Sequence, residues 1–287
     1  MVQWGRTPLH HPTAPKERVM ILDELAELTR NRIERQKKIY SLDAIRKDAE
    51  AMAAEEKEIA PFEYPFEKAL KKEGLSIISE VKKASPSKGV IAEDFPYLEI
   101  AKTYEESGAD AISCLTEPDR FKGSDEYLKA ITKEVKIPVL RKDFTVDPYM
   151  IYQAKLMGAS AVLLIAAILS DEELKSFYNI ADDLGLSCLF EAHDAEEVER
   201  CLAAGARIVG VNNRNLKDFT VDINNSIRLR EMVPGDVTFV SESGIEKPED
   251  VKALRSNGTD AVLIGEMLMR STDKKSLIQE LKEYGKN

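Results

Sequence analysis

A short motif that begins with glycine recurs four times in this chain at nearly even spacing. Gly108, Gly158, Gly205 and Gly258 each precede a short apolar run, as in Gly-Ala-Asp-Ala-Ile, at intervals of 50, 47 and 53 residues. A glycine in this position ends one helix and turns the chain into the next strand. Each repeat is long enough for two strand–helix units, so the pattern favours a closed eight-fold barrel over an open, doubly wound sheet.

Short apolar runs alternate with amphipathic segments from Ser76 onwards, and the runs are typical of buried strands. The predicted strands are Ile77–Val81, Ala111–Leu115, Pro138–Arg141, Ala161–Ala166, Ser187–Phe190, Ile208–Val211, Val237–Val240 and Ala261–Ile264. Helical spacing between them predicts helices such as Tyr97–Glu106, Tyr149–Met157, Glu172–Leu184 and Glu196–Ala203. Strands that alternate with helices are parallel and covered on both faces. The sequence therefore predicts an α/β fold, a single (βα)8 TIM barrel, and it contains no Gly-x-Gly-x-x-Gly loop of the kind an open sheet would favour.

The segment before the barrel has a different pattern. From Val19 to Lys57, apolar residues recur at helical spacing with a break near Tyr40, which predicts two helices. Pro61 and Pro65 predict a linker after them. We expect residues 19–60 to form N-terminal helices that cap the barrel and residues 61–287 to form the barrel itself. Residues 1–18 are expected to be a flexible extension or not native to the protein.

Composition and charge argue against several classes of function. The net charge is -10 and no basic block offsets it, which argues against nucleic-acid binding. No apolar run is long enough to span a membrane, and the first residues lack a secretory signal. The odd count of cysteines, without metal-ligand spacing, predicts a reducing compartment, the cytoplasm. Of the three, Cys114 and Cys188 lie in apolar runs and are predicted to be core residues.

Polar residues stand at or just after the ends of the predicted strands, where barrel enzymes place their chemistry. They are Glu80, Lys82, Glu117, Lys142, Glu191, Asn212, Arg214 and Glu242. Glu80 and Lys82 are two residues apart, so in a strand both face the same side. Taken alone, that pair is equally well explained as a solvated edge pair. Burying a Lys or Glu side chain costs free energy unless the side chain is paired. The whole set therefore indicates one functional site at the mouth of the barrel, where the carboxyl ends of the strands meet.

Glycines follow the last two predicted strands, in Ser241-Glu242-Ser243-Gly244 and Ile264-Gly265-Glu266. Backbone N–H groups in this pair of loops are the usual phosphate site of the barrel fold. Two ordinary glycine turns are the alternative. A carboxylate repels phosphate, so we expect the Glu266 side chain to point away and only its backbone to contribute.

Several segments together resemble the indole-3-glycerol-phosphate synthase family. They are Glu-Val-Lys-Lys-Ala-Ser-Pro-Ser-Lys-Gly from Glu80 to Gly89, Leu140–Phe144, Glu191, Gly210–Leu216 and Ser241–Gly244. The first of them is specific to that family. The resemblance runs from about Leu22 to the C-terminus and leaves residues 1–18 outside.

The resemblance implies a lyase of tryptophan biosynthesis. Its substrate, 1-(2-carboxyphenylamino)-1-deoxyribulose 5-phosphate, closes to a pyrrole ring with loss of carbon dioxide and then water. Such chemistry needs an acid at the ketose oxygen during ring closure, then an acid and a base for dehydration. It implies no metal and no cofactor. The implied partner is a small anionic substrate with a phosphate and a carboxylate, with no nucleic acid and no membrane, and the chain is expected to be a monomer or weak homo-oligomer.

The resemblance also implies roles for individual residues. Lys142 would be the first general acid, held by carboxylates such as Glu80 and Glu191. Lys82 would bind anionic groups, the phosphate included, and supply the dehydration acid, with Glu80 or Glu191 as base; that division stays open. Asn212 and Glu242 would position sugar hydroxyls and developing charge.

The remaining implied contacts are with the rest of the substrate. They comprise Ser85 and Arg214 for binding and ordering the site, and the backbones of Ser243, Gly244, Gly265 and Glu266 for phosphate. Phe121, Phe144 and Leu216 would form an apolar wall for the anthranilate ring, although core packing explains them equally well. The helices from Leu22 to Tyr40 would help exclude water.

Two rivals remain. Another sugar-phosphate barrel enzyme, an isomerase or epimerase, would favour metal-binding histidines at strand ends, and His193 is the one histidine in the predicted barrel. A non-catalytic phosphate-binding barrel subunit would keep the glycines and lose the lysines. The chain retains Lys82 and Lys142 together with Glu80 and Glu191, which argues against that second rival.

Overall fold

The computed structural model describes residues 21–215 and 219–286 and contains a closed parallel barrel. Its strands pair in the order β1-β10-β9-β8-β7-β6-β5-β4, and β4 pairs back to β1. They are β1 (Ser76–Val81), β4 (Ala111–Leu115), β5 (Val139–Lys142), β6 (Ala161–Ile165), β7 (Ser187–Ala192), β8 (Ile208–Asn212), β9 (Thr238–Glu242) and β10 (Ala261–Ile264). The predicted (βα)8 fold is therefore confirmed, with strand ends that differ from the predicted ones by at most two residues.

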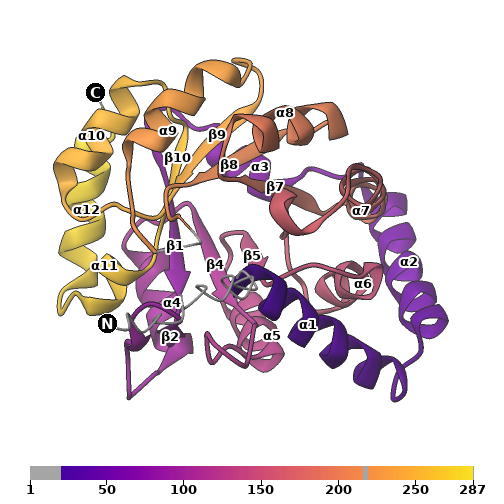
Figure 1. Ribbon diagram of the computed structural model, residues 1–287. Helices are drawn as coiled ribbons and strands as arrows, with labels where there is room; N and C mark the ends of the chain where they lie inside the picture. Colours follow the sequence, from indigo (N-terminus) through magenta and orange to yellow (C-terminus); the bar gives the residue numbers. More distant parts are fainter. Residues whose placement is uncertain (1–20, 216–218, 287) are drawn as a thin grey trace, which may run out of the picture.

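Helices form the outer layer of this barrel (Figure 1). They are α4 (Tyr97–Glu106), α5 (Asp125–Glu134), α6 (Pro148–Leu156), α7 (Asp171–Asp183), α8 (Ala195–Ala204), α9 (Asn224–Leu229), α10 (Pro248–Ser256), α11 (Glu266–Arg270) and α12 (Lys274–Tyr284). Two short 3-10 turns, η1 (Ala166–Ile168) and η2 (Arg230–Met232), complete the connections. The loop after β1 carries a small antiparallel hairpin of β2 (Ala84–Ser85) and β3 (Gly89–Val90).

The four repeated glycines take the left-handed conformation that their predicted role requires. Their φ angles are +92° at Gly108, +78° at Gly158, +93° at Gly205 and +85° at Gly258. Residues with a Cβ rarely adopt this conformation, so glycine is favoured where each helix ends. Each glycine precedes β4, β6, β8 or β10, which confirms the repeat as the turn into every second strand.

The core has two layers. Side chains such as Leu140, Leu163 and Leu189 fill the barrel interior, and a larger apolar layer packs between strands and helices. The three cysteines are free and buried, and burial raises the pKa of the Cys201 thiol to about 12, so they behave as core residues.

Three helices precede the barrel: α1 (Ile21–Lys37), α2 (Leu42–Ile59) and α3 (Pro65–Leu70). Ser41 caps α2 by accepting a hydrogen bond from the Ala44 N–H, which confirms the predicted break near Tyr40. Pro65 was expected in a linker, and this is wrong, because it opens α3 at a position where proline costs no hydrogen bond. The described helices include none long and apolar enough to cross a membrane.

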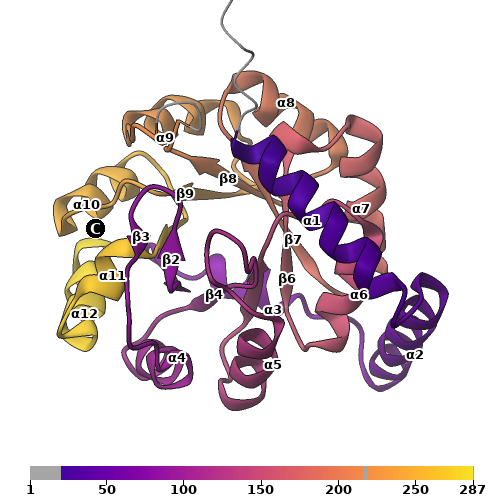
Figure 2. The ribbon, with the colours of Figure 1, turned by 60° about the horizontal axis from the view of Figure 1, so that its bottom comes forward.

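The N-terminal helices lie at different parts of the barrel. Helix α2 packs against α6, whereas Phe66 and Leu70 of α3 join the interior apolar cluster. Figure 2 shows α1 crossing one side of the barrel and the β2–β3 hairpin lying on the other side. Residues of both segments line a common cavity, so they flank the entrance to the barrel.

Candidate active site

A cavity opens at the carboxyl ends of the barrel strands and gathers nearly all of the predicted site residues. Its lining includes Glu80, Lys82, Ser85, Phe121, Lys142, Phe144, Glu191, Asn212, Arg214, Glu242, Ser243, Gly244, Gly265 and Glu266. Leu216 lies outside the described residues. Parallel strands in a barrel bring their carboxyl ends to one face, which explains how residues so distant in sequence converge.

Lys142 lies between two carboxylates at the centre of this cavity. From the end of β5, its Nζ donates hydrogen bonds to Glu191 Oε2 of β7 at 2.6 Å and to Glu242 Oε2 of β9 at 3.0 Å. The two glutamates are buried and the Lys142 side chain is 13% exposed. Charge-assisted hydrogen bonds of this kind offset the cost of burying the ammonium group.

Burial and neighbouring charges shift the pKa values of Lys142, Glu191 and Glu242 in different directions. Burial alone would lower the pKa of Lys142, but the charges of Glu191, Glu242 and Glu80 outweigh it and raise that pKa above its usual value. Burial raises the pKa of Glu242 to about 7, with Lys142 opposing and Glu191 adding to the rise. Burial would also raise the pKa of Glu191, yet Lys142 and His193 hold it well below its usual range. Lys142 therefore stays protonated while Glu242 can exchange a proton near neutral pH.

Glu80 and Lys82 form a second ion pair in the cavity, with 2.5 Å between Glu80 Oε2 and Lys82 Nζ. Both side chains are largely buried, so the solvated edge pair is ruled out for these residues. Gly265 leaves them room, because a Cβ there would lie 2.2 Å from Glu80 Oε2 and 2.7 Å from Lys82 Nζ. A residue with a Cβ at this position would therefore displace the ends of both side chains.

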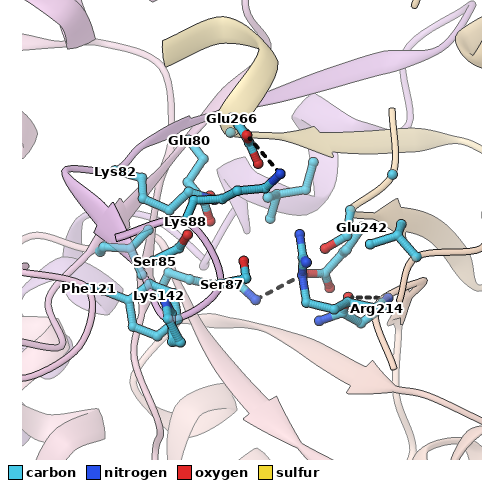
Figure 3. Close-up of a pocket in the computed structure, with 18 of the residues that line it drawn as sticks. Glu80, Lys82, Ser85, Ser87, Lys88, Phe121, Lys142, Arg214, Glu242 and Glu266 are labelled. Carbon is cyan, nitrogen blue, oxygen red and sulfur yellow. Dashed lines mark hydrogen bonds and ion pairs between the residues drawn. The ribbon is translucent and has the colours of Figure 1, made fainter. Parts of the chain in front are cut away.

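Asn212 and Arg214 extend the polar network from the end of β8. Asn212 Nδ2 donates to Glu191 Oε1 at 3.2 Å, and Asn212 Oδ1 accepts from the Arg214 N–H at 3.1 Å. Arg214 donates to the carbonyl of Phe219 at 3.3 Å, which closes its loop. Figure 3 shows Arg214 beside Glu242, facing Glu80 and Lys82 across the cavity.

The first of the two glycine loops, which follows β9, makes a sharp turn. Ser243 and Gly244 both have positive φ, +67° and +86°. Asn213 fixes this turn, since its Nδ2 donates to the Ser243 carbonyl and to Ser241 Oγ, both at 3.0 Å. Such a turn can direct successive N–H groups toward one anion.

The side chain of Glu266 is held by neighbouring cations. Its Oε1 accepts from Arg270 Nε at 3.0 Å and lies 3.7 Å from Lys88 Nζ, which extends from the loop after β1 (Figure 3). Glu266 nevertheless lines the cavity, so its negative charge is neutralised there by ion pairs.

Apolar side chains also line the cavity. The rings of Phe121 and Phe144 lie 6.2 Å apart between centroids, and Leu22 and Leu25 of α1 face the same space. A flat aromatic group would find contact area between them. Phe144 also belongs to the interior core cluster, so packing and cavity lining coincide there.

One predicted mouth residue, Glu117, has a different role. Its carboxylate accepts hydrogen bonds from the N–H groups of Asp119, Arg120 and Phe121, at 2.7 to 2.8 Å, and it does not line the cavity. The expectation that it faces the mouth is wrong, because the backbone of its own loop satisfies it. Glu117 instead shapes the loop that carries Phe121.

Several further residues contribute to the site without a clear signal in the sequence. Lys88 and Asn213 fall inside the motifs but were not singled out, and Arg32 of α1 pairs with the buried Asp143 next to Lys142. His193, noted in the sequence as a lone histidine, contacts Glu191. Within residues 21–215 and 219–286, no group of His, Cys, Asp and Glu side chains is placed to hold a metal ion.

Comparisons with known proteins agree with this architecture. The family model for indole-3-glycerol phosphate synthase matches residues 22–281. The indole-3-glycerol phosphate synthase of Ruminiclostridium cellulolyticum is 57% identical over 92% of this chain and 99% of that protein, and that of Lacticaseibacillus paracasei is 52% identical with the same coverage.

A search of solved structures found a thiamine phosphate pyrophosphorylase from Pyrococcus furiosus with a TM-score of 0.57 and 16% sequence identity. The match covers 73% of this chain and 95% of the chain of that structure. At this sequence identity the match supports the fold alone. The sequence comparisons, together with the cavity just described, decide the family: this chain belongs to the indole-3-glycerol phosphate synthases.

Proposed function

We propose that the cavity is the active site of an indole-3-glycerol-phosphate synthase and that Lys142 is its first general acid. The activity is that of the family, a carboxy-lyase step of tryptophan biosynthesis. The observation that carries the assignment of Lys142 is its position between Glu191 and Glu242, which keeps the ammonium group charged in a buried place. A charged ammonium can give a proton to the ketose oxygen of the substrate as the ring closes.

We assign the dehydration step to the second ion pair. Lys82 would donate the proton that leaves with water, and Glu80, 2.5 Å from it, would act as the base. The alternative base, Glu191, is held in its ionised state by Lys142 and so is a poor proton acceptor. Glu191 would therefore serve mainly to hold Lys142, with Asn212 and Glu242 arranged around the sugar hydroxyls.

The remaining parts of the cavity suit the rest of the substrate. We place the phosphate against the backbones of Ser243, Gly244 and Gly265 with help from Lys82, since the turn at positive φ and the neutralised Glu266 favour an anion there. The anthranilate ring would lie against Phe121 and Phe144. Helix α1 and the other N-terminal helices would cover the mouth and exclude water during the reaction.

The metal-dependent epimerase has little support. Its metal would need histidines with free ring nitrogens at strand ends, whereas both ring nitrogens of His193 face carboxylates.

The free, buried cysteines support a reducing compartment, and we propose the cytoplasm. Ile39 and Ile59 are the most exposed of the large apolar residues among those described. Ile39 lies in the turn before α2 and Ile59 is the last residue of that helix, so they form no common patch, which supports a monomer or weak homo-oligomer.

The test is turnover of the carboxyphenylamino deoxyribulose phosphate by the purified chain, followed by the fluorescence of indoleglycerol phosphate. We expect the product to appear with one carbon dioxide released for each indole ring formed. Substrate that binds without any turnover would contradict the proposal and favour a non-catalytic phosphate-binding barrel. Absence of both binding and turnover would contradict it in favour of another sugar phosphate.

A further inference from the structure

His193 lies directly behind the carboxylate that holds Lys142. It follows β7 two residues after Glu191, and its ring lies against the Glu191 carboxylate. Nε2 of His193 is buried, makes no hydrogen bond to any described residue, and lies 3.4 Å from Glu191 Oε1. His193 does not line the cavity, so it can reach a substrate only through Glu191.

The opposite side of the imidazole ring faces a second carboxylate. Nδ1 of His193 lies 3.0 Å from Glu197 Oε2 of α8, and the same oxygen accepts the His193 backbone N–H at 2.8 Å. The adjacent helix α9 contributes a neutral group, Asn225, whose Nδ2 donates to the His193 carbonyl at 2.9 Å. Among the described residues, the charged groups that face the ring are therefore Glu191 and Glu197, with Lys142 beyond Glu191.

The charge of the imidazole ring follows from a count of the hydrogen-bond donors that each protonation state offers to the two carboxylates. A neutral imidazole has one N–H and one lone pair, so either tautomer would direct a lone pair at a carboxylate oxygen. The doubly protonated ring can direct an N–H toward both Glu191 and Glu197. In agreement, burial would lower the pKa of His193, but the two carboxylates outweigh it and raise that pKa to about 10.

Ordinary helix capping explains only half of this geometry. Glu197 lies in the first turn of α8 and accepts the N–H of a residue just before the helix, a common arrangement at helix starts. That role accounts for Glu197 and the backbone of His193. It does not require the ring, and it gives no reason for Nε2 to face Glu191.

We propose that His193 is a positioning residue whose imidazolium ring holds Glu191 from behind, so that Glu191 Oε2 stays ionised and aimed at Lys142. Asn212 Nδ2 donates to Glu191 Oε1, the oxygen that His193 also faces, at 3.2 Å, and Lys142 donates to Glu191 Oε2. Three groups therefore hold this carboxylate. The proposal rests on the proposed function only in that Lys142 is the acid being held. It adds a cation behind the site that does not line the cavity.

The first arm of the test is nuclear magnetic resonance of the full chain with 15N-labelled histidine. We expect one imidazole, assigned by its loss in His193→Asn, to keep the shifts of a doubly protonated ring at about pH 8, where an ordinary histidine is neutral. Glu197→Gln should lower the pKa of that ring, and Glu199→Gln, which removes an exposed carboxylate from the same helix, should not. A ring that is neutral at this pH would overturn the proposal.

The second arm is kinetic. In His193→Asn the amide can still reach Glu197 but not Glu191, and in His193→Gln a longer, uncharged amide can reach Glu191. We expect kcat to fall by about tenfold or more in the Asn variant and by less in the Gln variant, with KM nearly unchanged because His193 does not touch substrate. Equal kcat in both variants and the parent would overturn the proposal, whereas an inactive parent protein would contradict the proposed function instead.

Discussion

Arg32 of α1 donates hydrogen bonds from Nη2 to both carboxylate oxygens of Asp143, at 2.9 and 2.8 Å. Asp143 directly follows Lys142, is fully buried, and also accepts from Thr116 Oγ1 at 2.6 Å. The pair therefore joins the helix that lies over the cavity to the residue beside the proposed acid. It couples the position of α1 to the position of Lys142.

Replacing Arg32 tests this coupling. In Arg32→Met, Asp143 keeps its charge in a buried place, and the cation that remains near it among the described residues is Arg141, 3.8 Å away. Breaking a buried pair in this way costs about 3–5 kcal/mol of unfolding free energy. Urea denaturation should show that loss together with a lower kcat, whereas Arg30→Met, on the exposed face of the same helix, should show neither. Full stability in Arg32→Met would contradict the coupling.

Gly265 offers a test of the second ion pair. A methyl group there would collide with Glu80 and Lys82, so Gly265→Ala should displace both and reduce kcat/KM by about a hundredfold. Gly235→Ala is the matched control, because a Cβ at that position meets nothing within 4 Å. The measurement is kcat/KM of the two variants by steady-state kinetics. Normal turnover in Gly265→Ala would show that the close fit has no catalytic role.

Glu242 predicts how activity depends on pH. Its pKa of about 7 is raised above that of an ordinary carboxyl, so the folded chain binds this proton more tightly than the unfolded chain. The stability it contributes is present at low pH and is lost as the pH rises through about 7. Over the same range ionised Glu242 strengthens its hold on Lys142, so kcat/KM should rise.

The measurement for Glu242 is the pH profile of kcat/KM between about pH 5.5 and about pH 8.5. Glu242→Gln should lose the inflection near 7, because the amide does not titrate in this range. The profile belongs to the coupled cluster of Lys142, Glu191 and Glu242 as a whole. An unchanged inflection in the variant would assign the titration to a different group.

Asn213 is expected to act on substrate binding. It fixes the Ser243 carbonyl and accepts from the Ser226 N–H and Oγ, at 2.9 and 2.8 Å, so it joins the loops after β8 and β9. Asn213→Ala should raise KM and weaken inhibition by inorganic phosphate more than it lowers kcat, because the phosphate turn loses its support. Asn179→Ala, on the exposed surface of α7, is the control. A change confined to kcat would contradict this role.

The sequence was sufficient for the barrel and for most of the cavity lining, and particular residues show why. Gly108 and its three counterparts must adopt positive φ, which is a constraint visible in sequence. Lys142, Glu191 and Glu242 follow apolar runs, and the barrel fold alone brings such strand ends together. Chain order also places β5, β7 and β9 at alternate positions around the barrel, but the hydrogen bonds of Lys142 depend on side-chain orientation, which chain order does not give.

The residues that sequence analysis missed depend on contacts between distant segments. Arg32 and Asp143 are separated by 111 positions, and nothing near either residue indicates the other. Glu117 was misassigned for the converse reason: a carboxylate at a strand end faces the mouth or caps its own loop according to local backbone conformation. Pro65 likewise fits a linker or a first helical turn until the structure distinguishes them.

If Lys142, held between Glu191 and Glu242, is the acid of ring closure, Lys142→Met should abolish turnover. Methionine preserves much of the side-chain volume while removing the proton, and Lys136→Met, at an exposed site before the same strand, is the control. We expect indoleglycerol phosphate fluorescence to collapse in Lys142→Met while the variant still binds the substrate and the control remains active. Turnover by Lys142→Met at the parent rate would contradict that role of Lys142.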